Sequence, residues 1–133
     1  MPLDISIDKW VDQYGMPTIT TDDGRLRFLI DTGATFNVLL QDAFDRCKPM
    51  FGKVGRDDMI IGMDGEPQKI FLVRGDICFD AHHFDAEFGV MEMTEALHTV
   101  RVLTGLRIDG ALGVDFFLRH NLCIDFAHLR VTD

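Results

Sequence analysis

One acidic side chain stands where an apolar segment of the chain stops and a turn begins. Residues 26–30 change from alternating apolar and basic side chains to an apolar run, which is typical of a strand that enters a core. Asp31 follows directly, before Thr32 and Gly33, and glycine allows a sharp turn or a close approach of the backbone. A carboxylate held there is a candidate catalyst, but Asp and Thr also bond nearby backbone groups in ordinary turns. The tripeptide alone favours the turn.

A second motif, much later in the chain, changes this interpretation. Ala111 and Leu112 form an apolar pair, Gly113 follows, and a short helix is expected over residues 114–120. An Asp-Thr-Gly-Ala sequence at a strand end, followed by an apolar pair with a glycine that opens a helix, resembles the retropepsin-like aspartic proteases. The resemblance covers residues 16–126, and its specific motifs lie at the two ends of that region.

The resemblance implies a single domain over residues 1–133 with an all-β fold, a closed acid-protease barrel that carries one short C-terminal helix. It also implies hydrolysis of peptide bonds by a water held between two carboxylates, one ionised and one protonated. This chemistry requires no cofactor and no metal. The chain has one Asp-Thr-Gly and no visible internal repeat, so a second copy must supply the other carboxylate. The implied partners are therefore a peptide or protein substrate and a second copy in a homodimer.

The resemblance assigns roles to the residues around Asp31, the implied catalytic residue. Thr32 would bond across the dyad to the partner chain, and Gly33 would contact the substrate through its backbone. The other supporting residues, which would hold the loop rigid, are Ala34, Thr35, Ala111, Leu112 and Gly113. Viral members have an Asp in place of Thr35 that pairs with an arginine, so dimerisation here must rely on other contacts. Residues 1–14, which begin as a strand, are a candidate for those contacts.

A hairpin rich in glycine is predicted between the two motifs. The apolar residues 59–61 lead into Gly62, Met63, Asp64 and Gly65, and a return strand is expected over residues 69–73. The resemblance places a flap here, with Met63 as the apolar tip, because glycines let a tip swing and approach a substrate. A plain surface hairpin, with Asp64 and Gly65 as its turn, explains the same residues equally well.

Periodicity and turn residues predict the remaining elements. Strands are expected over residues 3–7, 16–21, 25–30, 37–40, 74–79, 84–91 and 123–126, and residues 106–112 return to the core. A helical turn is expected over residues 41–47, and residues 94–103 fit a helix, with a strand over 99–103 as the alternative. Asp109 precedes Gly110 and suits a turn.

Length and composition bound the possible functions. The chain has 133 residues, which is enough for one core and too short for two catalytic lobes. Its net charge of −9 disfavours nucleic acid and anionic membranes as partners. Cys47, Cys78 and Cys123 lack metal-type spacing and are interpreted as buried free thiols in a reducing compartment. With no signal peptide or membrane span visible, a cytoplasmic location is expected.

Two alternatives come from other functional classes. The first is a non-catalytic dimerisation or peptide-binding module on the same fold, because fold does not fix function. The intact motif at Asp31 and Thr32 argues against it. The second is a metal-binding protein, since His83, Asp85 and Glu87 share one face of a predicted strand. A solvated polar face explains the same alternation and is the favoured interpretation.

Overall fold

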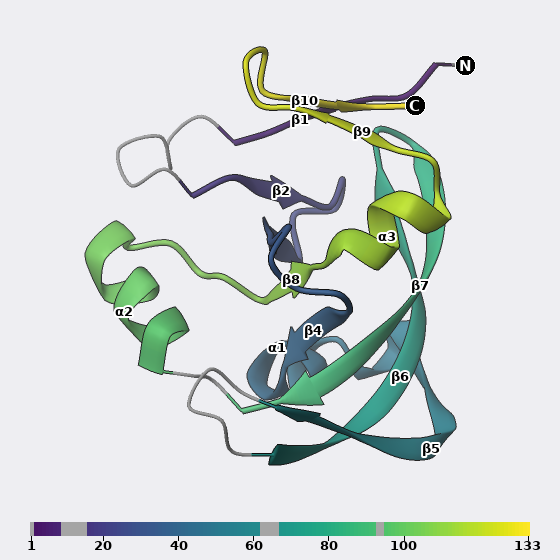
Figure 1. Ribbon diagram of the computed structural model, residues 1–133, viewed down its shortest axis with the longest axis vertical. Coiled ribbons are helices and arrows are strands. Elements are labelled where there is room, and N and C mark those ends of the chain that lie inside the picture. The colour runs from purple at the N-terminus through teal and green to yellow at the C-terminus, as the bar shows by residue number, and fades with distance from the viewer. Residues whose placement is uncertain (1, 9–15, 62–66, 93–94) are drawn as a thin grey trace.

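The computed structural model describes residues 2–8, 16–61, 67–92 and 95–133, and within them two β-sheets form the body of the molecule (Figure 1). A three-stranded sheet has the order β1-β10-β9, and a seven-stranded sheet has the order β2-β3-β8-β4-β7-β6-β5. The strands are β1 (Asp4–Ser6), β2 (Thr18–Thr20), β3 (Arg27–Ile30), β4 (Asn37–Leu40), β5 (Phe51–Ile61), β6 (Pro67–Phe79), β7 (His82–Met91), β8 (Gly110–Leu112), β9 (Cys123–Asp125) and β10 (Arg130–Thr132).

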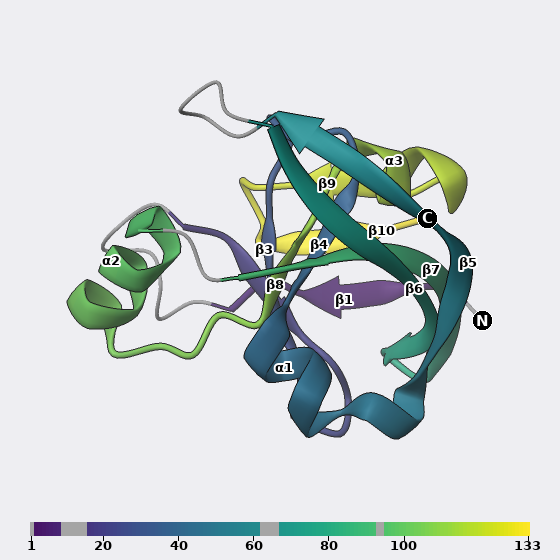
Figure 2. The same cartoon turned by 90° about the horizontal axis from the view of Figure 1, so that it is seen from below.

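Helices connect the strands at three places in the described residues. They are α1 (Gln41–Arg46), which a short 3-10 turn, Lys48–Met50, follows, then α2 (Glu95–Thr104) and α3 (Val114–Arg119). In Figures 1 and 2 α2 and α3 lie on opposite sides of the molecule. The prediction of a helix at α3 is confirmed, as is the helical turn at α1. Residues 95–104 form the helix and not the alternative strand.

The mostly β architecture predicted from the sequence is confirmed, and three details differ. The predicted strands 69–73 and 74–79 form one continuous strand, β6, because no turn residue interrupts the ladder with β7. β10 is not predicted, since its three residues are too few to show a period. Neither sheet closes on itself through the pairings of the described strands, so the closed barrel is not confirmed.

The short strand β8 lies between β3 and β4 in the centre of the large sheet. It runs parallel to β3, with Leu112 opposite Ile30, and antiparallel to β4, with Ala111 opposite Val38. A Cβ on Gly110 would stand 2.1 Å from the carbonyl oxygen of Val38, so only glycine lets the strands approach this closely. β8 therefore joins the C-terminal third of the chain to the strand that ends at Asp31.

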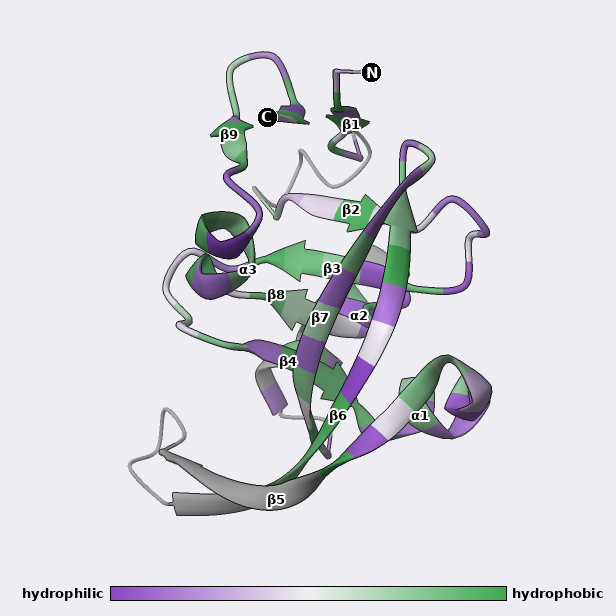
Figure 3. Ribbon diagram, turned by 90° about the vertical axis from the view of Figure 1, so that its right-hand side faces the viewer, coloured by the Kyte–Doolittle hydropathy of each residue, from purple (hydrophilic) through white to green (hydrophobic). Residues whose placement is uncertain are grey.

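Aromatic side chains fill the core where the long hairpin of β6 and β7 folds over β3. Phe28 on β3 stacks on Phe88 with ring centroids 5.5 Å apart and meets Phe79 edge to face at 6.4 Å. All three side chains are fully buried. Figure 3 shows the hydrophobic colour along β3 and the alternation of colour along β6 and β7, which each present one face to this core.

The turn between β6 and β7 is held by a side chain from another hairpin. Asp80 and Ala81 both have positive φ, 50° and 61°, a conformation that is costly for residues other than glycine. The carboxylate of Asp22 accepts the N–H groups of Asp80 at 2.9 Å and Ala81 at 2.7 Å. The pKa of Asp22 is lowered, chiefly because its carboxylate accepts the bond from the N–H of Ala81.

The first and last strands meet in the small sheet. Ile5 of β1 pairs with Val131 of β10, and both side chains are buried. The N-terminal strand, predicted as part of residues 3–7, thus pairs within its own chain. The two edges of this sheet are β1 and β9.

Candidate functional site

Asp31 stands at the exit of β3 with its side chain partly exposed. Its Oδ1 accepts the N–H of Gly33 at 3.0 Å, and its carbonyl oxygen accepts the N–H of Ala34 at 3.1 Å. The turn expected from the tripeptide alone is therefore present. The turn leaves most of the carboxylate's hydrogen-bonding capacity free, because the bond from Gly33 is the one hydrogen bond that the side chain accepts from the described part of the chain.

The second motif braces this loop through its backbone. The carbonyl oxygen of Leu112 accepts the N–H of Asp31 at 3.0 Å. Directly after Gly113, the N–H of Val114 donates to the carbonyl oxygen of Ala34 at 2.8 Å. The N–H of Asp115 donates to the carbonyl oxygen of Thr35 at 3.2 Å. A Cβ on Gly113 would lie 2.6 Å from a backbone oxygen, so the loop and α3 are in close contact here. The structure thus brings together the two motifs that the sequence separates.

Asn37 is a supporting residue that sequence reasoning missed. Its buried side-chain amide accepts the N–H of Gly113 on Oδ1 at 3.0 Å and donates through Nδ2 to the carbonyl oxygen of Glu87 at 3.0 Å. It therefore ties the exit of the Asp31 loop to α3 and to β7. The available signal was a lone amide at the start of an otherwise apolar strand, a position that requires a hydrogen-bond partner when buried.

A cleft of about 510 Å³ opens beside Asp31 and Thr32. Apart from these two residues, its walls are apolar. Ile30 is the last residue of β3, and the others lie beside the ends of β1, β2, β9 and β10; they are Ile7, Met16, Pro17, Phe126 and Leu129. The ring of Phe126 is 50% exposed, and Leu129 has a φ of 54°. A bulky apolar side chain and a strained backbone at a cleft with a carboxylate are features found at binding surfaces.

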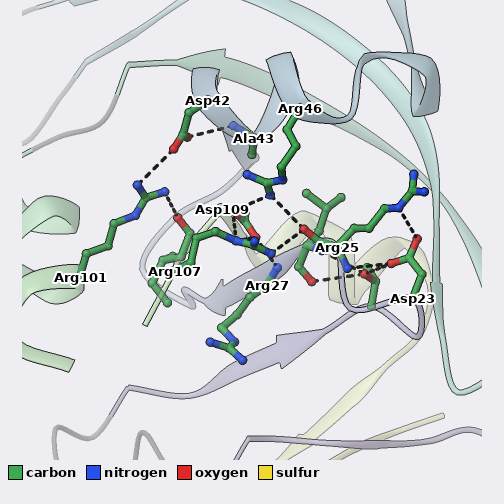
Figure 4. Close-up of polar contacts among 12 residues, drawn as sticks. Asp23, Arg25, Arg27, Asp42, Ala43, Arg46, Arg101, Arg107 and Asp109 are labelled. Atoms are coloured by element: carbon green, nitrogen blue, oxygen red, sulfur yellow. Dashed lines mark hydrogen bonds and ion pairs between the residues drawn. The ribbon is translucent and has the colours of Figure 1, made fainter. Parts of the chain in front are cut away.

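The prediction of a turn at Asp109 is wrong. Asp109 is fully buried directly before β8 and accepts the N–H of Arg27 on Oδ2 at 2.8 Å. Figure 4 shows Arg46 and Arg107 pointing toward its carboxylate, with nitrogen to oxygen distances of 2.9 and 3.1 Å. Sequence reasoning missed this because Arg46 and Arg27 lie far from Asp109 in the chain, and a buried carboxylate requires such partners.

The metal alternative receives no structural support. His83 bonds Asp76 through Nδ1 at 2.6 Å, and Asp85 pairs with Arg74 at 3.3 Å, so these side chains do not converge. Across residues 2–8, 16–61, 67–92 and 95–133, no group of three or more His, Cys, Asp or Glu is arranged to hold a metal ion.

The three cysteines only partly match their prediction. All three are free, but only Cys47 is buried; Cys78 is partly exposed and Cys123 is exposed. Burial, followed by the bond that its thiol donates to Asp22 at 3.3 Å, raises the pKa of Cys78. Strands β9 and β6 each turn one face outward, which is why two of these residues escape the core.

The predicted flap residues Gly62, Met63, Asp64 and Gly65 lie outside the described residues. The strands that lead to them, β5 and β6, pair up to Ile61 and Pro67. Among the residues that the structure describes, no helix is long and apolar enough to cross a membrane.

Comparisons with known proteins support the fold. No family model matches the sequence, and no curated protein matches it. Among solved structures, the fold is similar to that of a retropepsin-like aspartic protease from Rickettsia conorii, with a TM-score of 0.60 at 14% identity. The match covers 99% of this chain and 89% of that one. The chain is therefore similar in fold to a retropepsin-like aspartic protease.

Proposed function

We propose that this protein is an aspartic endopeptidase whose active site forms where two copies of the chain meet. The observation that carries the proposal is the state of Asp31: its loop is held rigidly by β8 and α3, while its carboxylate remains partly exposed at a cleft. A carboxylate that is fixed in place but not saturated with hydrogen bonds is suited to hold and activate a water.

The proposed reaction uses Asp31 and the same residue of the second copy. One carboxylate is ionised and takes a proton from the shared water as the oxygen attacks the peptide carbonyl carbon. The other is protonated and donates to the carbonyl oxygen, where negative charge develops. Collapse of the tetrahedral intermediate breaks the C–N bond, and a proton passes to the leaving amine. Thr32 supports the pair from across the interface, Gly33 contacts the substrate, and the residues of the flap close over it.

The position of the cleft supports a two-fold dimer. For two copies of Asp31 to share one water, the partner must cover the face that carries Asp31 and Thr32, which is the mouth of the cleft. Phe126 and Leu129 give that face the apolar character of a dimer interface. Ile7 and Phe126, which line the cleft, directly follow β1 and β9, the edge strands of the small sheet, so a partner on this face lies next to both edges.

The decisive experiment is cleavage of a mixed peptide library by the wild type and by Asp31→Asn. We expect the variant to lose cleavage by roughly 1,000-fold or more, because one proton-transfer group of the dyad is gone. Asp45→Asn, which neutralises an exposed acid on α1, is the control and should cleave normally. Equal background from the wild type and Asp31→Asn would support a peptide-binding module instead of a protease.

Mixing the two chains tests whether the site is shared. After unfolding and refolding together, wild type and Asp31→Asn should give an activity that falls as the square of the wild-type fraction. An activity proportional to that fraction would show that each chain is complete by itself, and would refute the shared dyad.

The interface has its own test in Phe126→Asp. We expect this change at the cleft to give monomers in solution and to abolish cleavage, because a charge replaces an apolar contact. Leu118→Asp on α3 is the matched control, since Leu118 is 70% exposed and does not line the cleft. If Phe126→Asp remains a fully active dimer, the partner does not sit on this face.

A further inference from the structure

We propose that Asp109 is a positioning residue for Asp31, and that its buried carboxylate holds β8 in the register that braces the Asp31 loop. The inference rests on the proposed function only for its activity measurement; the register itself can be measured without a substrate.

Asp109 bonds both strands that flank β8. Its backbone N–H donates to the carbonyl oxygen of Arg27 at 2.9 Å, and its carboxylate accepts the N–H of the same residue at 2.8 Å. Its carbonyl oxygen accepts the N–H of Leu40 at 2.9 Å. A single residue thus fixes the start of β3 and the end of β4 relative to the first residue of β8.

The arginines extend this hold to the segment before β3. Arg46 and Arg107 contact the carboxylate of Asp109, and each also donates from Nη2 to the carbonyl oxygen of Arg25 at 2.9 Å. Each guanidinium therefore connects the residue before β8 to the segment before β3, as Figure 4 shows. Because Arg46 belongs to α1, the helix after β4 is joined to the same cluster.

β8 needs such a hold because its own side chains define its register weakly. The strand has three residues, Gly110, Ala111 and Leu112, and only Leu112 is large. Strands rich in glycine and small residues are prone to slip, and a slip of one residue turns each side chain to the opposite face. A buried ion pair adds little net stability, yet it disfavours arrangements that leave the charge unpaired. Its contribution here is therefore to the choice of register.

The register at the foot of β8 determines the contacts at its other end. Gly110 lies opposite Phe28, and Leu112 lies opposite Ile30. One residue further along the chain from Ile30, the N–H of Asp31 donates to the carbonyl oxygen of Leu112 at 3.0 Å. A shift of β8 would remove that bond and those that residues 113–115 make to the loop. Asp109 therefore acts on Asp31 through about 13 Å of paired backbone and does not touch the reacting atoms.

Amide hydrogen exchange on the free protein tests the register directly. We expect Asp109→Ala to speed exchange at the amides of Asp31, Gly113 and Val114 by roughly 100-fold, and Asp109→Asn by roughly tenfold. Asn retains an oxygen for the N–H of Arg27 but loses the charge. These factors are what remains after the loss of overall stability, measured by urea unfolding, has been subtracted; on the same basis, amides in the β6–β7 ladder, such as that of Phe88, should change less than about twofold. Asp45→Asn should change none of these rates.

If the loop amides speed up only by the factor that the loss of overall stability accounts for, the inference is overturned, because the substitution then has no local effect on the loop. Unchanged rates at the three loop amides would overturn it as well. If Asp109→Ala does not fold, Asp109→Asn alone decides between these results.

The activity measurement separates this inference from the proposed function. With a peptide that the wild type cleaves, Asp109→Asn should have a kcat about tenfold lower than the wild type and a KM within about twofold of it. This is expected when binding is intact and the catalytic group is misplaced. If the wild type cleaves nothing but the exchange pattern is as expected, the proposed function fails and the register role stands. If the wild type cleaves and Asp109→Asn keeps its full kcat, the positioning role fails alone.

Discussion

Two aspartates stand at opposite ends of the same pair of strands, and their surroundings differ sharply. Asp109, at the start of β8, is fully buried and accepts bonds from a backbone N–H and two guanidinium groups. Asp31, at the end of β3, is partly exposed, and within the described residues its carboxylate accepts one bond, from the N–H of Gly33. A carboxylate surrounded by donors serves the structure, whereas one left incompletely bonded on a rigid loop is available for chemistry.

The Asp31 loop is held by groups other than its own carboxylate. The groups that hold Asp31 are backbone atoms of residues 112–115 and the amide of Asn37, so the loop is fixed without using the carboxylate. The following substitutions test whether the two ends behave as differently as their contacts indicate.

Removal of the carboxylate at Asp109 should have the largest effect on stability. We expect Asp109→Ala to lower the free energy of unfolding by about 2–4 kcal/mol, because the N–H of Arg27 loses a charged acceptor and the partly exposed Arg46 and Arg107 lose their carboxylate partner. Urea unfolding followed by circular dichroism measures this. Asp45→Asn serves as the control, with a change within about 0.5 kcal/mol. A loss below about 1 kcal/mol for Asp109→Ala would remove the distinction between the two aspartates.

Asn37→Ala should follow in size. The change leaves the buried N–H of Gly113 without this acceptor, which costs about 1–3 kcal/mol, and it also removes the bond to the carbonyl oxygen of Glu87. Urea unfolding again provides the measurement. Gln41→Ala is a suitable comparison, because the amide of Gln41 bonds the exposed Asp45 and its loss should matter little. Equal effects of the two substitutions would mean that the amide does not brace the loop.

Asp22 provides an intermediate case, exposed but bonded to two backbone N–H groups. Its pKa lies below the ordinary value, chiefly through the bond from Ala81, so its ionised form stabilises the fold at neutral pH. We expect Asp22→Asn to cost about 1 kcal/mol at pH 7, since exposure to solvent weakens the bonds.

The pH dependence of that cost provides the check. Because the pKa is lowered in the fold, the stabilisation is complete above the unfolded pKa of about 4 and is lost as pH falls through the folded pKa. The difference between wild type and Asp22→Asn, measured by thermal unfolding, should therefore shrink in acid. A difference that grows in acid would give the opposite sign and contradict the assignment.

Asp31→Asn should have the smallest effect on stability although it has the largest on activity. The amide oxygen can still accept the N–H of Gly33, so we expect a change within about 0.5 kcal/mol in urea unfolding. A loss of several kcal/mol would show that Asp31 is a structural carboxylate like Asp109.

The sequence predicted the parts of the site that depend on local patterns. An apolar run that stops at Asp31 indicates a strand end, and the resemblance to the retropepsin-like proteases implied that Ala111, Leu112 and Gly113 hold the Asp31 loop. Both predictions agree with the backbone contacts of the structure. The strands predicted over residues 16–21 and 25–30 likewise form the hairpin of β2 and β3, and Gly24 in the turn between them has a φ of 75°.

What the sequence left out depends on contacts between distant residues. Asp109 next to a glycine has the local pattern of a turn, and nothing nearby in the chain reveals that Arg46 will approach it. Asn37 in an apolar strand shows only that some partner is needed. The strand β10 is too short for periodicity, and its existence follows from pairing with β1 at the other end of the chain.

The central place of β8 has a consequence for how the molecule assembles. Residues 110–112 pair with residues 28–30 and 38–39, so the strand that completes the site comes from the far end of the chain. Pairings across such a sequence separation form slowly, since a long loop must close before any bond forms. On the ribosome, a nascent chain already contains Asp31 but lacks the strand that fixes it until residue 112 has emerged. The carboxylate is therefore synthesised well before the strand that gives it ordered surroundings.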